Sequence, residues 1–329
     1  MTPTTFWARL RRATNGQPIP ALIALALLVA IVAFRAPSFM SFGNISNIVD
    51  QAAIPAIIVV GLTFVILMGS IDLSVEGLMA LGSMSAALLV ANDRNATALG
   101  FWAIPLVMVF GAIMGLLSGL AVTRLSIPSF LATIAISSVC SGFALILFGT
   151  TAKPQILDGA FIGLAQGSFL GFTKVSWIAL IVVIAGLVVQ RYTRFGRYAY
   201  VIGGNEETAR LSGIPVRRYR IGAFVISGVC CTLAGALTAS RTSIGSVSPG
   251  DGVLFLTIAS VVIGGTVLTG GRGGVLHSVI GVLIMSVIVT GMVLIGVNGL
   301  FQQIIQGTVL LVAVAAVAWK LRQPLRVVA

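Results

Sequence analysis

Long apolar segments alternate with short polar connections along most of this chain. Many of these segments approach the ~20 apolar residues that an α-helix needs to cross a bilayer. The pattern predicts an all-α polytopic membrane protein with about ten transmembrane helices. The predicted segments cover residues 20–34, 48–69, 73–91, 100–123, 127–149, 175–190, 220–240, 253–269, 275–297 and 300–319.

Two connections in this pattern are very short, at Gly69–Asp72 and at Gly270–Gly274. Either one is also compatible with a break inside a discontinuous or re-entrant helix, and the count then falls to eight. Irregular backbone at membrane depth is stable only where protein or a water-filled cavity covers it. A break at either place therefore indicates a position beside a transport path.

The composition excludes a soluble globular protein, because 58% of the residues are hydrophobic and only 9% are charged. The mean hydropathy is +1.10. A net charge of +12 suits a nucleic-acid-binding protein, but here the basic residues lie mostly beside the ends of apolar segments. Membrane topology explains such a distribution, so we predict no nucleic-acid partner.

The basic residues also predict an orientation. With ten crossings and both termini in the cytoplasm, 15 of the 20 Lys and Arg residues fall on the cytoplasmic side. The remaining five on the outside are Arg35, Arg94, Lys153, Lys174 and Arg241. This bias follows the positive-inside rule and supports the model.

The one long polar segment runs from Gln190 to Arg220 and carries seven arginines. Within it, Asn205 is a typical helix N-cap, and Glu206 and Glu207 follow in the favourable first turn. Gly213 and Pro215 lie where such a helix would end. The segment predicts either a short helical lever for a cytoplasmic partner or an ordered positive-inside loop, and the spacing leaves both open.

Six of the eight acidic residues lie in or beside predicted connections. The other two, Asp72 and Glu76, are four residues apart, which predicts one helical face beside Ser74. An acid at membrane depth is a candidate for handling a polar substrate or a proton. The alternative is a helix start, which we favour for Glu76 and which remains open for Asp72.

The last apolar segment contains amides. Gln302 and Gln306 share one helical face, with Asn298 one turn earlier. Amides suit a path for a hydroxylated substrate, and they also join helices to one another in membranes. Both interpretations remain open.

Other features indicate packing rather than chemistry. Gly111, Gly115 and Gly119 recur every four residues, as in closely packed membrane helices. The three cysteines lie in apolar stretches and His277 has no nearby ligand partner, so no metal site or cofactor is predicted. The glycine-rich segments lack the order of a phosphate-binding loop, and no intramembrane-enzyme motif is present.

Several ordered motifs resemble the membrane permease subunits of bacterial ABC sugar importers of the ribose, xylose, arabinose and autoinducer-2 type. The resemblance extends from Asn44 to Trp319. The motifs are GSIDLSV at 69–75, IPSFLAT at 127–133, GGN at 203–205, ARLSGI at 209–214, VIGGT at 262–266, GGRG at 270–273 and QQIIQG at 302–307.

The resemblance implies that the lever is a coupling helix that docks on an ATPase. Glu207, Ala209 and Gly213 match the family's E-A-A-x-x-x-G spacing, whereas Thr208 replaces the middle alanine. The implied coupling residues are Gly204, Asn205, Glu206, Glu207, Ala209, Arg210 and Gly213. The implied path residues are Asp72, Ser74, Asn298, Gln302 and Gln306.

The resemblance also implies one permease domain over residues 1–329, with the coupling loop at 191–220, in the bacterial inner membrane. Its expected partners are a cytoplasmic dimer of ATP-binding subunits, a second permease subunit and an external sugar-binding protein. The expected fold is that of the vitamin B12-importer type of permease. The chain itself is then a transport subunit without catalytic residues.

Two other functions stay open. A permease for branched-chain amino acids or another non-sugar solute shares this architecture, although no clear buried charge pair suits a zwitterion. A secondary transporter needs an intramembrane ion or proton site, for which Asp72 is the best candidate.

Overall fold

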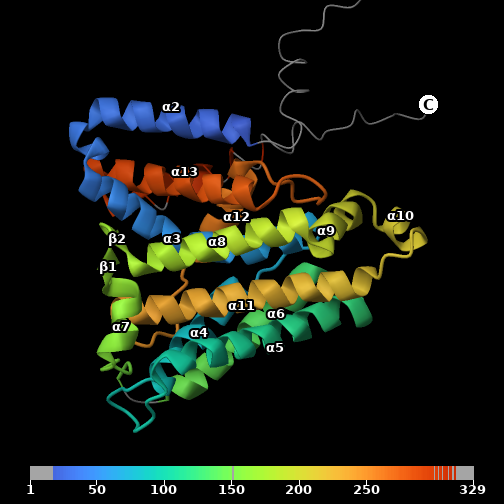
Figure 1. Cartoon of the computed structure of the whole chain (residues 1–329), viewed down its shortest axis with the longest axis horizontal. Helices are drawn as coiled ribbons and strands as arrows, with labels where there is room; N and C mark the ends of the chain where they lie inside the picture. Colours follow the sequence, from blue (N-terminus) through green and yellow to red (C-terminus); the bar gives the residue numbers. More distant parts are fainter. Residues whose placement is uncertain are drawn as a thin grey trace, which may run out of the picture.

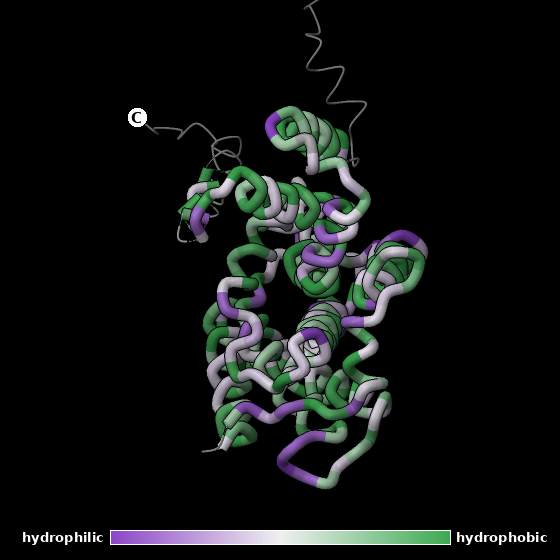
Figure 2. Tube along the Cα trace, turned by 90° about the vertical axis from the view of Figure 1, so that its left-hand side faces the viewer, coloured by the Kyte–Doolittle hydropathy of each residue, from purple (hydrophilic) through white to green (hydrophobic). Residues whose placement is uncertain are grey.

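The computed structural model describes residues 18–149, 152–299, 301–302, 304–305, 307–309, 311–312 and 315. Its long helices lie side by side with their axes roughly aligned (Figure 1). Seen along these axes, the apolar residues dominate the helices and the hydrophilic residues gather mainly in connecting segments (Figure 2). This is the distribution expected of a bundle that is surrounded by lipid.

The elements with defined bounds are α2 (Ile19–Arg35), η1 (Pro37–Met40), α3 (Phe42–Leu67), α4 (Val75–Leu89), η2 (Gly100–Trp102), α5 (Ala103–Arg124), α6 (Ser129–Phe148), α7 (Gly159–Gln166), β1 (Ser168–Phe169), β2 (Phe172–Thr173), α8 (Lys174–Tyr192), α9 (Arg194–Gly204), α10 (Glu206–Leu211), α11 (Val216–Thr242), α12 (Val253–Gly264) and α13 (Val275–Leu294).

The bundle has two different ends (Figure 1). One end carries α9 and α10, together with most arginines of residues 191–220, and is called the arginine end below. The other carries α7 and the antiparallel pair β1–β2, and is called the hairpin end. The segments that join α3 to α4 and α12 to α13 also begin at the arginine end.

Helices α3 and α11 form the core of the bundle. Most of the second half of α3 is buried, and Ile57, Leu62 and Phe64 are at most 1% exposed. Helix α11 packs against α3, α4 and α5. The two helices are also tied near the hairpin end, where the guanidinium of Arg241 on α11 pairs with the carboxylate of Asp50 on α3.

The glycine repeat on α5 faces α11, as the sequence predicts. A Cβ on Gly111 would lie 2.3 Å from the carbonyl oxygen of Gly228, and one on Gly115 would lie 2.3 Å from that of Phe224. A Cβ on Gly119 would lie 2.8 Å from Cα of Ile221. The absence of side chains allows the two backbones to touch, so the packing interpretation of this repeat is confirmed.

The chain between the end of α3 and the start of α4 is not helical. Helix α3 ends at Leu67, Gly69 has φ +71°, and α4 begins only at Val75. The intervening backbone lies along α6, where it donates to side-chain oxygens: Ile71 N–H to Ser129 Oγ at 3.0 Å and Leu73 N–H to Thr133 Oγ1 at 2.9 Å. These hydroxyls accept hydrogen bonds from backbone amides that have no helical partner, because the chain is not helical here.

A second non-helical segment lies between α11 and the short helix α12. After α11, the segment 243–252 runs back along α4, since Ser246 N–H donates to Ser83 Oγ and Gly252 N–H donates to Glu76 Oε1, both at 3.1 Å. Helix α12 then starts at Val253 and ends at Gly264. The short helices α4 and α12 therefore begin next to each other, beside Glu76.

The structure supports an all-α polytopic membrane protein. In the described part of the chain, six helices are long and apolar enough to cross a membrane, and α2, α4 and α12 are shorter apolar helices. Helix α3 begins six residues before the predicted segment at 48, and α12 ends well before residue 269. The polar segment 190–220 is mostly helical, because it contains α9 as well as α10.

Candidate functional site

The short helix at the arginine end starts where its sequence predicts. The side chain of Asn205 accepts a hydrogen bond from the N–H of Thr208 at 2.9 Å, which caps α10. Glu206 and Glu207 occupy the first turn. The helix ends at Leu211, and Gly213 follows with φ +76°, a conformation that glycine adopts without strain.

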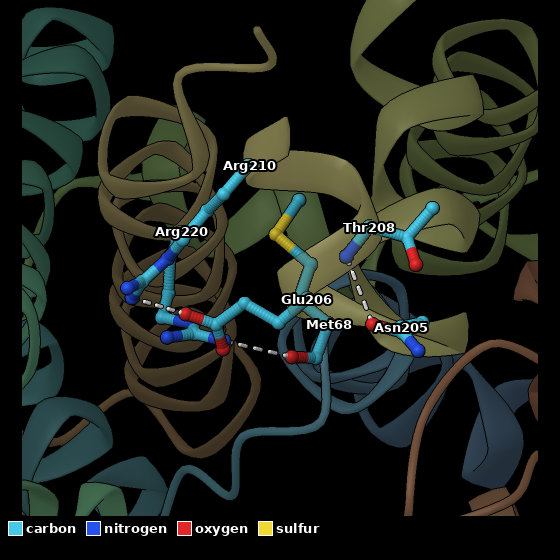
Figure 3. A network of polar contacts seen from close by, with 6 residues as sticks. All are labelled: Met68, Asn205, Glu206, Thr208, Arg210 and Arg220. Atoms are coloured by element: carbon cyan, nitrogen blue, oxygen red, sulfur yellow. Dashed lines mark hydrogen bonds and ion pairs between the residues drawn. The ribbon is translucent and has the colours of Figure 1, made fainter. Parts of the chain in front are cut away.

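The carboxylate of Glu206 joins α10 to α11 (Figure 3). One oxygen accepts from Arg210 of the same helix at 2.6 Å, and the other accepts from Arg220 of α11 at 2.7 Å. The side chain of Arg220 is only 16% exposed, compared with 63% for Arg210. The contact with Arg220 is therefore the less solvated of the two, and it holds α10 against the bundle.

The same Arg220 nitrogen also reaches the carbonyl oxygen of Met68 at 3.4 Å, at the turn that follows α3 (Figure 3). Two more segments meet this turn. Gly271 N–H donates to Leu67 O at 2.9 Å, and a Cβ on Gly203 of α9 would lie 1.8 Å from the same oxygen. The turn at Leu67–Gly69 thus contacts α9, α11 and the α12–α13 connection.

The hydrogen bond from Arg220 lowers the pKa of the Glu206 carboxyl below its usual 4.5, although partial burial acts in the opposite direction. Because the lowered pKa favours the ionised form, Glu206 is an anion at neutral pH. The bridge between α10 and α11 is then fully charged under physiological conditions.

The outer face of α10 is open. Glu207 and Thr208 are exposed, and Leu211, one turn after Glu207, is 85% exposed. Ala209 on the opposite face is fully buried. An exposed leucine beside a carboxylate on a capped helix is a suitable contact for another protein. The sequence analysis did not select Leu211, although its i+4 spacing from Glu207 was visible.

Asp72 lies deep in the bundle and is 1% exposed. Its Oδ1 accepts from the N–H of Ser74 at 2.9 Å and from its hydroxyl at 2.5 Å, and its Oδ2 accepts from the Ser227 hydroxyl at 2.6 Å. Ser227 lies roughly 16 Å along α11 from its first residue, at ~1.5 Å per residue. Asp72 therefore lies about three helical turns beyond the start of α11, with its oxygens held by serines.

The prediction that Asp72 and Glu76 share one helical face is wrong. Helix α4 starts at Val75 with Ser74 at the N-cap position, so Asp72 precedes the helix in non-helical backbone. Glu76 is in the first turn of α4, as favoured from the sequence. Its contact with Gly252, at the start of α12, could not be foreseen from local spacing.

The amides of the last segment lie elsewhere. Gln302 lines a cavity of about 640 Å³ with Asp251 and Met285, and its Nε2 donates to the Val297 carbonyl at 3.0 Å. The N–H of Gln302 donates to the carbonyl of Asn298, which places these two residues one turn apart. Gln306 lies outside the described residues. Asp72 and Ser74 do not line this cavity.

Candidate sites for a metal ion are absent from the described residues, since no three His, Cys, Asp or Glu side chains gather there. The described cysteines, Cys140, Cys230 and Cys231, are free and buried among the helices, as predicted for small apolar residues. His277 lines a cavity near Arg272 at the arginine end.

A bundle in which the short helices α4 and α12 follow non-helical segments is typical of membrane transport proteins. Residues 44–314 match the family described as "Branched-chain amino acid transport system / permease component". The chain belongs to this permease family. It is a multi-pass inner-membrane subunit with a transport role rather than an enzyme.

Curated relatives cover nearly the whole chain. The ribose import permease protein RbsC of Haemophilus influenzae is 37% identical over 89% of this chain and 91% of its own length. The probable ABC transporter permease protein YphD of Escherichia coli is 37% identical over 90% and 87%. The galactose/methyl galactoside import permease protein MglC of E. coli is 34% identical over 89% and 91%. No solved structure matches the chain.

Proposed function

We propose that this chain is the transmembrane subunit of an ATP-driven importer and forms the path for a monosaccharide or a similar small polyol. The observation that supports a sugar as the substrate is the similarity to ribose and galactose import permeases over about nine tenths of the chain. The carboxylate bridge of Glu206 supports the coupling part of the proposal. Residues 1–329 then form one permease domain, with the coupling loop at 191–220.

Coupling acts through the outer face of α10. Glu207 and Leu211 are free to enter a groove of a cytoplasmic ATPase, whereas Ala209 faces the bundle. Asn205 fixes the start of the helix and Gly213 allows the chain to turn away after it. Gly204, next to the cap, has open space around its Cα, whereas Gly203 is held against α3.

Motion of α10 passes directly to the turn after α3. The carboxylate of Glu206 pairs with Arg220, and Arg220 reaches the carbonyl oxygen of Met68, only a few residues before the non-helical backbone that carries Asp72. Arg210 holds the other oxygen of the same carboxylate. Because a rigid displacement of α10 moves both α11 and this turn, ATP binding in a partner can bias the bundle between two states.

The sugar path uses the polar groups at membrane depth. Asp72 and Ser74 belong to the non-helical segment between α3 and α4, and Asn298, Gln302 and Gln306 belong to the last segment. Gln302 borders the cavity beside α12, whereas Asp72 and Ser74 are buried in this state. In the proposed cycle the non-helical segment moves away from α11 and exposes Asp72 and Ser74 to the sugar.

The proposed assembly contains two permease subunits, two cytoplasmic ATP-binding subunits and an external sugar-binding protein. The arginine end faces the cytoplasm, in keeping with the positive-inside rule, and the ten-helix topology places both termini there. The hairpin end then faces the binding protein. We expect the fold type of the vitamin B12-importer permeases.

Uptake into cells that lack their own sugar importers tests the substrate and the energy source. Cells that express this chain with its ATPase and binding protein receive labelled ribose, galactose or leucine, with ATP depleted or with an uncoupler present. We expect sugar uptake that stops on ATP depletion and persists with the uncoupler. Leucine uptake instead would assign the transporter to amino acids, and uptake that stops only with the uncoupler would overturn the ATP-driven mechanism.

A further inference from the structure

A cavity of about 670 Å³ lies at the arginine end, away from α10. Its walls come from the start of α2, the end of α12, the connection 265–274, the start of α13 and Tyr200 of α9. Small residues, among them Ala21, Ala24 and Gly265, line it and leave the space open. None of the proposed coupling or path residues borders it.

The cavity carries one cationic side chain, that of Arg272. The imidazole of His277 also lines it, and no acidic side chain of the described residues does. The guanidinium of Arg272 is exposed and forms no ion pair with a described residue. A cation held beside a cavity without a neutralising partner attracts an anionic ligand.

The backbone that carries Arg272 is rigidly held. Its carbonyl accepts from Val267 N–H at 3.1 Å, and the hydroxyl of Tyr200 donates to the neighbouring Gly273 carbonyl at 2.6 Å. Burial raises the pKa of Tyr200, so this donor keeps its proton. Gly271 and Gly273 flank Arg272 with φ of +72° and +104°. The loop thus fixes the position of Arg272, while its charged group has no structural partner in the described chain.

The position beside α2 identifies the kind of anion. Leu22, Ile23 and Leu27 on the outer side of α2 are 46%, 50% and 60% exposed, as expected for a helix surface in contact with lipid. The cavity meets the first turns of this helix at the arginine end, where the cytoplasmic lipid head groups lie in the proposed orientation. Basic cavities between membrane helices on this side suit anionic head groups.

We propose that this cavity binds the phosphate of an anionic phospholipid head group, with Arg272 and His277 as the contacting side chains and α2 beside the acyl chains. The site is independent of sugar transport and of α10. It needs only the folded chain in a membrane that contains anionic lipid.

Native mass spectrometry of the detergent-purified full chain tests the site, with equal amounts of phosphatidylglycerol and phosphatidylcholine added. We expect the wild type to retain phosphatidylglycerol preferentially. Arg272→Gln should lower this preference about fivefold, the effect of one basic residue at a membrane surface. Ala24→Leu, which narrows the cavity without changing charge, should also lower it. Arg124→Gln is the matched control, since Arg124 is exposed at the same end of the bundle but does not line the cavity.

Three results would overturn the proposal. Equal retention in the wild type and in both cavity variants means that the cavity does not select the lipid. An equal loss in Arg124→Gln means that general surface charge holds it. Displacement of the lipid by inorganic phosphate at matched concentration means that a free anion, rather than a head group, occupies the site.

Discussion

Arg220 of α11 donates to Glu206 of α10 at 2.7 Å, and its same nitrogen lies 3.4 Å from the Met68 carbonyl oxygen. One guanidinium thus contacts the exposed helix and the turn that ends α3. Because Arg241, farther along α11, pairs with Asp50 of α3, these two helices are linked by polar contacts near both ends. Helices α3 and α11 are the elements best placed to carry a displacement from the arginine end to the hairpin end.

Arg220→Gln should release α10 from the bundle. The hydrogen bond from Arg220 to Glu206 is charge-assisted, and such a hydrogen bond contributes roughly 1.5–3 kcal/mol. Hydrogen exchange of the α10 amides should be faster in this variant by at least about tenfold. Arg210→Gln is the matched control, because Arg210 contacts the same carboxylate but is 63% exposed, and a solvated pair contributes only about 0–1 kcal/mol. Equal effects of the two variants would contradict the assignment of Arg220 as the anchor.

The bridge should also depend on pH. The pKa of Glu206 is lowered in the folded chain, so its contribution is complete above its unfolded value of 4.5 and is lost as the pH falls below that value through the folded pKa. Exchange of α10 amides, corrected for intrinsic rates, should rise in the wild type across this acidic window. Glu206→Gln should show fast exchange with no such transition. A wild-type transition near neutral pH would assign the effect to another group.

Ser227→Ala should destabilise the bundle, since it leaves one oxygen of the buried Asp72 carboxylate without its donor. An unsatisfied buried group costs about 1–3 kcal/mol, and more where it is charged. Thermal unfolding in detergent should therefore occur at a lower temperature. Ser118→Ala provides the control, because the equally buried Ser118 hydroxyl donates only to the Met114 carbonyl of its own helix. A larger loss in Ser118→Ala would contradict the importance of the Asp72 contact.

Thr133→Val should disturb the non-helical segment between α3 and α4 in a similar way. The substitution keeps the side-chain shape and removes the oxygen that accepts from Leu73 N–H at 2.9 Å. The amide then lies in the bundle without this partner, at a cost of about 1–3 kcal/mol. Thr123→Val is a suitable comparison, since Thr123 donates within its own helix to Gly119. Equal melting temperatures for the two variants would indicate that this segment does not depend on α6.

Some of this structure follows from local sequence. The Asn205 cap, the two acids after it and Gly213 define α10 without distant contacts, and the spacing of Gly111 and Gly115 on one face is sufficient to predict close helix packing. Apolar length alone also indicates a membrane protein.

The burial of Asp72 and the path of the non-helical backbone before α4 do not follow from local sequence. They depend on side chains that are distant in the chain, namely the hydroxyls of Ser129 and Thr133 on α6 and of Ser227 on α11. The repeat of hydroxyl residues on α6 at Ser129, Thr133 and Ser137 is a local signal that could have indicated this role. Periodicity cannot show which backbone those hydroxyls serve.

Co-purification of the chain with its ATPase tests the central claim most directly. Leu211→Asp and Glu207→Arg change the open face of α10, where Leu211 is 85% exposed, so the fold should be preserved. Both should abolish ATPase association and ATP-dependent sugar uptake, whereas Leu157→Asp, which changes a leucine that is 63% exposed near the hairpin end, should leave the association intact. Unchanged association and uptake in the α10 variants would contradict the coupling function proposed for this helix.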